Sequence, residues 1–311
     1  MRLLQKKTFK KAPFVSIILV DWCVRESFHV LEYLNHQRFD REAYEIIWLE
    51  LYDRRPKEIE TLIKRYEDLG LPSPIDTWIL MDYSRTEYYH KHRMYNLGIL
   101  HSSGQVVTIL DSDTILKTTF VEAIVREFEK QKSLVLHLEQ IRNFDKKYYP
   151  FNYPSIDEII GEGCVNAING IPTGFDKNPK SLKRDWNLWH VYNYGACFCA
   201  NREDLIYIGG ADEHEDYLGH ICGPYEMTAR LINAGVPDRL HPTEWSYHVW
   251  HPNTAGENNN YWGPNNGKGM STTALEIALT GRVMPLIENE EIKKLRLTLT
   301  RSQENIVQIN Q

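Results

Sequence analysis

The chain has 311 residues, 42% of them hydrophobic and 25% charged, which are the proportions of a globular protein that can bury a sizeable core. Its net charge of −6 at pH 7, without an extended basic stripe, excludes nucleic acid as an expected partner. The sequence holds no apolar run long enough to predict a membrane-spanning helix.

Strand-like and helix-like segments alternate through the first part of the chain. Apolar runs at 14–20, 44–51, 76–83 and 106–111 predict strands, and the nearly unbroken run at 14–20 is typical of a strand covered on both faces. Segments between and after them predict helices at 26–36, 57–70, 88–103 and 118–131. This alternation is typical of a doubly wound α/β fold, so we expect a mixed, mainly parallel sheet flanked by helices.

Two aspartates, Asp111 and Asp113, stand where the fourth predicted strand ends. Ligands of doubly wound sheets bind beyond the carboxyl ends of the strands, which is the edge where both acids fall. Two carboxylates one residue apart offer oxygen ligands to a hard divalent cation that carries a diphosphate. A turn, or a cap before the helix at 118–131, is the alternative explanation of the same residues.

Two downstream segments have compositions typical of ligand contacts. The segment 185–199 gathers tryptophans and tyrosines before an apolar strand, and such rings can stack on a flat ligand such as a sugar or a base, or complete the core. The segment 253–271 is rich in Asn and Gly, which predicts a lid loop from which Lys268 or Tyr261 can reach phosphates. A plain surface loop is the alternative for this second segment.

Several segments resemble the family-two glycosyltransferases, which have the GT-A fold. The stretch HRMYNLGILHSSGQVVTILDSD, at 92–113, resembles their Arg/Asn/Gly helix followed by a strand and a DxD motif. The start VSIILVDWCVRESFHVLEYL, at 15–34, and the stretch GGADEHEDYLGHICGPYEMTARLINAG, at 209–235, resemble further parts of the same family. The resemblance implies a GT-A-like single domain with a nucleotide half and an acceptor half.

This resemblance implies a metal-dependent glycosyltransferase that moves a single sugar to a hydroxyl of a glycan or lipid-linked acceptor. A UDP-sugar is the expected donor, Mn²⁺ or Mg²⁺ the expected cation, and inversion the expected stereochemistry. The QxxRW motif of related processive synthases is missing from the sequence, which favours single-sugar transfer over polymerisation. The alternatives are a non-catalytic sugar- or nucleotide-binding module of the same fold and a nucleotidyltransferase.

For the metal, the resemblance implies the DxD acids Asp111 and Asp113 and a downstream histidine as ligands. His248 fits the family position, and His251 follows three residues later, close enough for both rings to face one site. A borderline metal such as Mn²⁺ accepts an imidazole among carboxylates and phosphates, and Mg²⁺ stays open.

The resemblance also implies the residues that hold the nucleotide, a set to which Asp111 belongs. Val20 and Asp21 occupy the base-binding turn after the first strand, and Glu50, at the end of the second, matches a carboxylate that contacts the base or ribose. Arg93 and Asn96 match the Arg/Asn part of the helix pattern, with helix packing and capping as the alternative role.

The catalytic base is expected just before or within a helix that ends in Arg-Leu. In the family an acidic Glu-Asp pair occupies the positions that Gly223 and Pro224 hold here. We therefore predict Glu226 as the base, with Asp216 as the second choice, because a base needs only to reach the acceptor hydroxyl with a usable pKa. An ion pair of Glu226 with Arg230, four residues later, is the structural alternative.

The ends of the chain differ in composition from the region between them. We expect a basic segment at 1–13, a nucleotide-sugar-binding half at 14–113, an acceptor half at 114–285 and a helical tail at 286–311. The basic segment can touch an anionic membrane surface or form a solvated, frayed terminus. The amphipathic tail can pack on the core or on a second subunit, which would make a homo-oligomer.

Cysteine spacing and the start of the chain predict the compartment. The five cysteines include no CxxC pair, and the first residues lack the apolar centre of a signal peptide. We therefore expect a cytoplasmic protein, with peripheral contact at the inner membrane face as an extension of that prediction.

Overall fold

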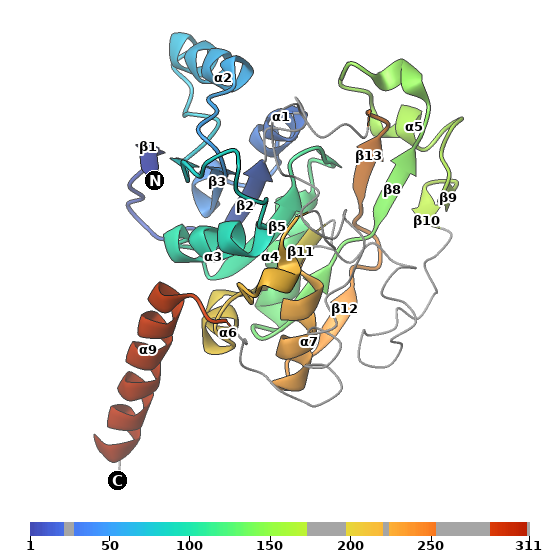
Figure 1. Ribbon diagram of the computed structural model, residues 1–311. Coiled ribbons are helices and arrows are strands. Elements are labelled where there is room, and N and C mark those ends of the chain that lie inside the picture. The colour runs from blue at the N-terminus through green and yellow to red at the C-terminus, as the bar shows by residue number, and fades with distance from the viewer. Residues whose placement is uncertain (22–27, 173–196, 220–223, 253–286, 310–311) are drawn as a thin grey trace.

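The computed structural model describes residues 1–21, 28–172, 197–219, 224–252 and 287–309. An eight-stranded sheet forms its centre (Figure 1). In spatial order its strands are β1 (Arg2–Lys6), β4 (Thr77–Leu80), β3 (Tyr44–Glu50), β2 (Val15–Asp21), β5 (Val106–Asp111), β11 (Cys197–Asn201), β7 (Val135–His137) and β12 (Asp238–Leu240). Strands β4, β3, β2 and β5 are parallel, and β11 is antiparallel to both of its neighbours. The expected mixed, mainly parallel sheet is confirmed.

Helices cover both faces of this sheet, as Figure 1 shows. One core includes residues of α1 (His29–Asn35), α2 (Lys57–Asp68) and α4 (Phe120–Lys130). The opposite core includes residues of α3 (Lys91–His101), α6 (Arg202–Tyr207), α7 (Tyr225–Asn233) and α9 (Glu290–Ile309). The short α5 (Ile156–Ile159) and the 3-10 helices η1 (Arg41–Ala43), η2 (Lys146–Tyr148) and η4 (Glu215–Tyr217) lie in connections. The four helices predicted in the first half are present, each with shorter bounds.

The sequence of β2 explains why both faces are covered. Its side chains alternate, so Ile17 and Leu19 enter the first core and Ile18 and Val20 enter the second. Each such side chain contributes about 1.5–3 kcal/mol when it is fully buried. In α3, a Cβ added at Gly98 would lie only 2.6 Å from the Cδ1 of Ile18, so glycine allows this helix to lie close against the strand.

A second, smaller sheet stands beside the carboxyl end of β5. Its order is β6 (Ile115–Leu116), β13 (Ser246–Val249) and β8 (Gln140–Asn143), with β13 antiparallel to β6 and parallel to β8. A separate hairpin joins β9 (Ala167–Ile168) to β10 (Ile171–Pro172). The smaller sheet brings the downstream histidines to the end of β5.

The first residues of the chain form a strand, so the expectation of a frayed terminus is wrong for Arg2–Lys6. Strand β1 pairs antiparallel with β4 at the edge of the large sheet. The Nε atom of Arg2 donates to both carboxylate oxygens of Asp82, each 2.9 Å away. Polar residues are typical of such edge strands because they discourage pairing with other chains.

The tail begins by packing on the core and then extends away from it (Figure 1). Ile292 in the first turn of α9 is fully buried, and Leu295 and Leu299 pack against the same core while partly exposed. Among the described residues, no helix combines the length and the apolar character needed to cross a membrane.

The connection from β12 to β13 depends on a buried histidine. The Nδ1 atom of His241 accepts the backbone N–H groups of Thr243, at 3.2 Å, and Glu244, at 2.9 Å. Burial lowers the pKa of His241 to about 4. The neutral ring is therefore the form that the fold requires.

We expect the free energy of unfolding to decrease as the pH falls below about 6.5. Between pH 6.5 and pH 4, His241 binds a proton in the unfolded chain, whereas in the folded chain it stays neutral because its pKa is about 4. This difference in proton binding favours unfolding. The loss from this residue between pH 7 and pH 5 is about 2 kcal/mol. Urea unfolding at both pH values measures it. His241→Asn keeps an acceptor near the Nδ1 position and does not titrate, so its free energy of unfolding should decrease between pH 7 and pH 5 by about 2 kcal/mol less than that of the unmodified chain. An equal decrease in both proteins would contradict the prediction.

Candidate active site

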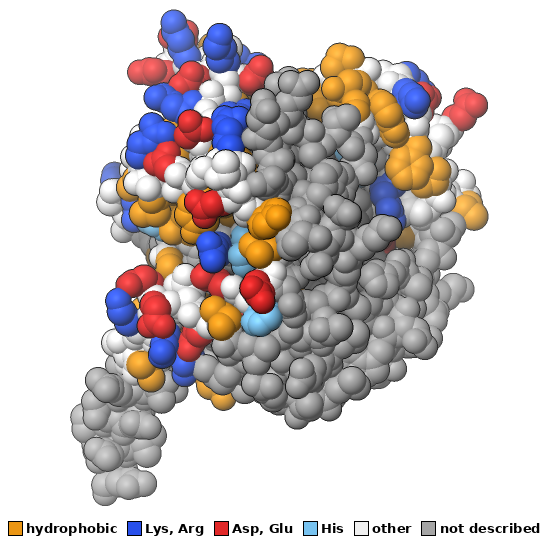
Figure 2. All heavy atoms as spheres, viewed as in Figure 1, with side chains coloured by type: hydrophobic (Ala, Val, Ile, Leu, Met, Phe, Trp, Pro, Cys, Tyr) orange, Lys and Arg blue, Asp and Glu red, His pale blue; other side chains and the backbone are white. Residues whose placement is uncertain are grey.

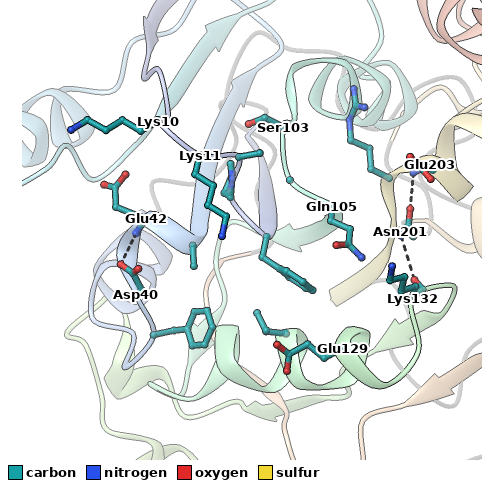
Figure 3. A pocket seen from close by; sticks show the side chains of 18 residues that line it. Lys10, Lys11, Asp40, Glu42, Ser103, Gln105, Glu129, Lys132, Asn201 and Glu203 are labelled. Atoms are coloured by element: carbon teal, nitrogen blue, oxygen red, sulfur yellow. Dashed lines mark hydrogen bonds between the residues drawn. The ribbon is translucent and has the colours of Figure 1, made fainter. Parts of the chain in front are cut away.

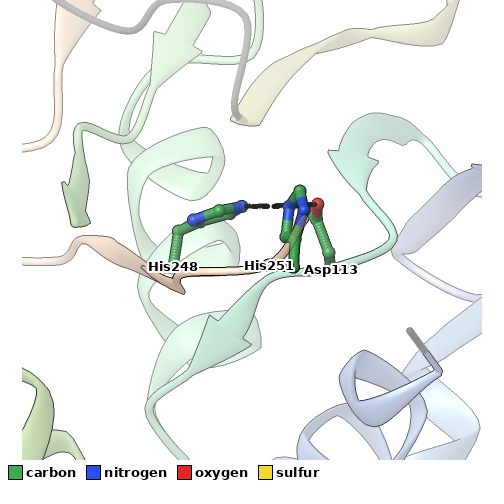
Figure 4. Close-up of side chains that lie close together, drawn as sticks. All are labelled: Asp113, His248 and His251. Carbon is green, nitrogen blue, oxygen red and sulfur yellow. Dashed lines mark hydrogen bonds and ion pairs between the residues drawn. The ribbon is translucent and has the colours of Figure 1, made fainter. Parts of the chain in front are cut away.

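Asp113, His248 and His251 each bring one potential ligand atom to a common point (Figure 4). From the Oδ2 atom of Asp113, the Nε2 atom of His251 is 3.1 Å away and that of His248 is 3.4 Å away. The two Nε2 atoms are 3.0 Å apart. Asp113 is buried, and the side chains of His248 and His251 are 15% and 8% exposed, so the cluster is compact and largely shielded from solvent.

Pairing between β6 and β13 assembles this cluster. Asp113 lies two residues before β6, and Ile115 pairs with Tyr247, the residue before His248. His251 follows two residues after β13, where the chain turns back toward the same point. The register of a short two-residue strand therefore decides whether the carboxylate and the imidazoles meet.

This donor set fits a divalent cation. Two ligand atoms that bind one ion at about 2.1 Å and at right angles are about 3.0 Å apart. The observed separations run from 3.0 to 3.4 Å, so one ion can contact all three atoms. Three protein ligands leave a six-coordinate ion with positions for phosphate oxygens.

His29, which the sequence did not indicate as a site residue, contacts the backbone of Asp113. The Nε2 atom of His29 is 2.9 Å from the carbonyl oxygen of Asp113. Burial lowers the pKa of His29 to about 4, so the ring is neutral at pH 7 and donates this hydrogen bond from Nε2. The contact ties α1 to the backbone of the carboxylate residue. The one sequence signal for it is a polar side chain among the buried positions of α1.

Strand register places the predicted nucleotide residues along one edge of the sheet. Val20 pairs with Asp111, and Asp21 pairs with Glu50, so three neighbouring strands end together. Glu50 is fully buried and accepts a hydrogen bond of 2.9 Å from the Trp48 indole. Asp111 is half-buried and does not belong to the three-residue cluster. Its assignment as a metal ligand and the nucleotide contacts of all four residues stay predictions.

Asn96 and Arg93 connect α3 to the segment after α6. The buried Asn96 amide donates to the carbonyl of Ala211, at 2.8 Å, and its oxygen accepts the backbone N–H of the same residue, at 2.7 Å. A Cβ added at Gly210 would overlap the Asn96 oxygen, so this contact requires glycine. Arg93 is 39% exposed at the side chain, and its Nε atom lies 4.0 Å from a carboxylate oxygen of Glu213. These contacts favour a packing role for Asn96, and nucleotide contact stays a prediction for both residues.

The carboxylate of Glu226 is held in a buried ion pair. The Nε atom of Arg230 lies 2.6 Å from one carboxylate oxygen, and Nη2 lies 3.0 Å from the other. The backbone N–H of Asp212 also donates to Glu226, at 2.9 Å. Both partners of the ion pair are at most 1% exposed. The structural alternative that the sequence suggested for Glu226 is therefore present, and its role as a base stays a prediction.

Asp212 is a second buried acid beside Glu226. Burial raises its pKa, and the neighbouring carboxylate raises it further. Its Oδ1 atom accepts the backbone N–H groups of His214 and Ile287, each at 3.0 Å, which fixes the start of the tail segment. Asp212 therefore has a structural role in joining α7 to the tail.

The other predicted contacts lie outside the described residues. The backbone of Asp216 belongs to η4, but its side chain is not among those that the structure describes. Lys268 and Tyr261, with the whole predicted lid, are outside the described part of the chain as well, and so are residues 185–196 of the aromatic segment. Their functions stay predictions.

A cavity of about 950 Å³ lies away from the cluster, near the amino ends of β2 and β5 (Figure 3). Its charged lining consists of Lys10, Lys11, Lys132 and Arg202 with Asp40, Glu42, Glu129 and Glu203. Because these charges balance, the cavity has no net attraction for a nucleoside diphosphate. The metal-ligand geometry at the carboxyl edge, and not cavity size, identifies the candidate active site.

Residues 82–207 match the model of Glycosyl transferase family 2. The matched residues make up less than half of the chain, and over them the chain is similar to that family. The family 2 match includes α3, Asp111 and Asp113, and it ends at Tyr207, the last residue of α6. The predicted resemblance to this family is confirmed. The histidines that complete the cluster lie beyond the matched residues.

Solved structures with a similar fold include that of S. aureus TarS, with 12% identity and a TM-score of 0.52 over 77% of this chain and 37% of that chain. Another is S. aureus TarS 1–349 in complex with UDP-GlcNAc, with 10% identity and a TM-score of 0.55 over 91% of this chain and 70% of that chain. At these identities the likeness shows a shared fold, which confirms the GT-A-like architecture that we expected. No curated protein matches the chain in sequence.

Proposed function

We propose that the chain is a metal-dependent glycosyltransferase that transfers a single sugar from a nucleoside diphosphate sugar to a hydroxyl of a glycan or lipid-linked acceptor. The observation that carries this proposal is the cluster of Asp113, His248 and His251 at the carboxyl edge of the sheet, in a chain whose residues 82–207 match the family 2 model. Ligands of such sheets bind at this edge. The cluster would hold the cation that stabilises a diphosphate leaving group.

Mn²⁺ is the cation that we propose for this cluster. Mg²⁺ prefers a shell of oxygen ligands, whereas the softer Mn²⁺ accepts imidazole among oxygen ligands. Two of the three ligand atoms in the cluster are imidazole nitrogens, which favours Mn²⁺. When bound, the cation neutralises the charge that develops on the leaving diphosphate.

The residues of the chain hold and orient the donor. We propose that Asp111 and Asp113 face the diphosphate while Val20, Asp21 and Glu50 contact the nucleoside. A UDP-sugar is the proposed donor, which is supported by the shared fold of TarS 1–349, whose structure contains UDP-GlcNAc. Arg93, Asn96 and Lys268 are further proposed donor contacts.

The proton of the acceptor hydroxyl needs a base, for which we propose Asp216 or Glu226. Glu226 can take the proton only if it gives up its contacts with Arg230, and this favours Asp216. Attack by the deprotonated hydroxyl on the face of the sugar opposite the diphosphate gives inversion, which is the stereochemistry that we propose.

Donor turnover tests this proposal. With Mn²⁺ present, the purified chain should slowly release a nucleoside diphosphate from a UDP-sugar or a GDP-sugar, because water replaces the acceptor. Coupled detection of UDP and GDP measures the release, and Asp216→Asn should reduce it while donor affinity is unchanged. Measurable nucleotide binding without any release would instead favour the non-catalytic module.

The non-catalytic module stays a second candidate because of one specific feature. Gly223 and Pro224 occupy the positions of an acidic pair in the family, and the nearby Glu226 is engaged by Arg230. A module of this kind would bind a sugar nucleotide through the same cluster. The turnover measurement separates the two candidates.

Location and assembly remain proposals as well. We propose a cytoplasmic protein whose exposed Lys6, Lys10 and Lys11 contact an anionic membrane surface. We also propose that α9 pairs with a second copy, since Leu297 is 45% exposed on it.

A further inference from the structure

A second cavity, of about 470 Å³, lies between α1, α2 and the loop that follows η2. Its aromatic walls are Phe28, Phe151 and Tyr153. Such a volume is within the range of pockets that bind small molecules. Hydrophobic side chains gather on the surface between β8 and α5 in Figure 2, and the exposed aromatic residues of this segment are Phe144, Tyr149 and Tyr153.

This cavity shares two residues with the surroundings of the metal-ligand cluster. His29 lines the cavity and also bonds the backbone carbonyl of Asp113. Phe151 lines it as well, with its ring centroid 4.4 Å from that of His29 and 6.5 Å from that of His251. A ligand in the cavity would therefore lie beside the proposed reaction centre, separated from it by the rings of His29 and Phe151.

The polar side of the cavity is one face of α2. Lys57, Thr61 and Arg65 recur every four residues, so their side chains share this face. Arg65 pairs with Glu32 of α1, which also lines the cavity. Lys57 and Thr61 are exposed and make no hydrogen bond or ion pair with the described part of the chain, which leaves their donors available to a ligand.

The aromatic wall is held in a defined position. Tyr153 has a φ of 51°, a backbone conformation that non-glycine residues adopt rarely and that clusters at functional sites. Its ring lies 6.5 Å from that of Tyr33 in α1. The hydroxyl of Tyr33 in turn donates to the carbonyl of Pro154, at 3.1 Å. The two sides of the cavity are thus tied together by contacts that fix the spacing between the aromatic loop and the helices.

We propose that this cavity is a carbohydrate subsite that holds a sugar ring of the acceptor. A pyranose has an apolar C–H face, which packs on aromatic rings, and an edge of hydroxyl groups, which bond to charged and hydroxyl side chains. The cavity offers an aromatic wall opposite a polar helix face, which is this combination. The inference rests on the proposed transferase function, because it assigns the acceptor of that reaction to the carbohydrate class.

The test measures carbohydrate binding and nucleotide binding separately in the same variants. Saturation-transfer NMR with maltotetraose, chitotetraose and mannotetraose reports the first, and calorimetry with UDP and Mn²⁺ reports the second. Tyr153→Ala removes an exposed ring, and Phe151→Leu keeps an apolar side chain beside His29 while it removes the aromatic face. Tyr207→Ala is the matched control, because Tyr207 is 60% exposed in α6 and does not line the cavity.

We expect at least one tetrasaccharide to bind the unmodified chain. Its affinity for each cavity variant should be about tenfold lower, and its affinity for the Tyr207→Ala control should be unchanged. Failure of all three to bind, or equal binding by the cavity variants, would overturn the proposal. Weaker UDP binding in the same variants would also overturn it, since the cavity would then belong to the nucleotide site. If the chain binds carbohydrate but neither UDP nor GDP with Mn²⁺, the subsite stands and the transferase function fails.

Discussion

Replacing Asp113 with asparagine should weaken Mn²⁺ binding at least 100-fold without unfolding the protein. The carboxylate is the one anionic ligand in the cluster, and its Oδ2 atom is the atom that both imidazole nitrogens approach. Asparagine keeps the shape and the backbone hydrogen bond from His29, but it offers the ion a neutral oxygen. Even loss of an outer-shell partner typically costs a metal site 10- to 100-fold, so loss of a charged ligand should cost more than that.

Titration of Mn²⁺ alone, followed by the paramagnetic resonance of the free ion, measures this affinity without a nucleotide. Asp53→Asn is the matched control, because Asp53 is 62% exposed at the side chain and pairs with Arg85 outside the cluster. Its affinity should equal that of the unmodified chain. Unchanged Mn²⁺ affinity in Asp113→Asn, with normal unfolding, would exclude the cluster as the metal site.

Replacing Glu226 with glutamine should lower the free energy of unfolding by about 3–5 kcal/mol. The substitution removes one charge of a fully buried pair and leaves the Arg230 guanidinium without its counter-charge. Arg230 is itself fixed by the carbonyls of Ile208 and Gly210, so it cannot move to solvent without further loss. Chemical denaturation at pH 7 measures the change.

Glu60→Gln provides the comparison for this experiment. Glu60 pairs with Arg55 at 2.6 Å, but the side chains are 42% and 51% exposed. Exposed pairs contribute at most about 1 kcal/mol, so this variant should stay close to the unmodified chain. If Glu226→Gln keeps full stability and loses donor turnover, the structural role is wrong and Glu226 is the base.

The central strands could be predicted from the sequence because each strand carries its own local signal. The apolar runs at 14–20, 44–51 and 106–111 became β2, β3 and β5 within one residue of the expected ends. Strand β1 was not predicted, because RLLQK is short and polar. It forms by pairing with β4, which is far away from it in the sequence. Strand β6 has two residues, too few for any periodicity.

The candidate site was predictable where it depends on residue type and order. Asp113 and His248 were selected in this way, and they do meet. His29 could not be selected, since its role depends on the position of α1 relative to the end of β5 and the contact spans 84 positions in sequence. Glu226 was chosen as an acid near the expected place, but burial with Arg230 is a property of packing that the local sequence only suggested.

Calorimetric titration of UDP and GDP into the chain, first with Mn²⁺ and then with EDTA, tests the proposed metal centre directly. We expect one of the two nucleotides to bind with Mn²⁺, and this binding to be lost in EDTA and in Asp113→Asn. Binding that persists in EDTA, or no binding of either nucleotide, would contradict the claim that Asp113, His248 and His251 form the metal centre of a nucleotide-sugar site.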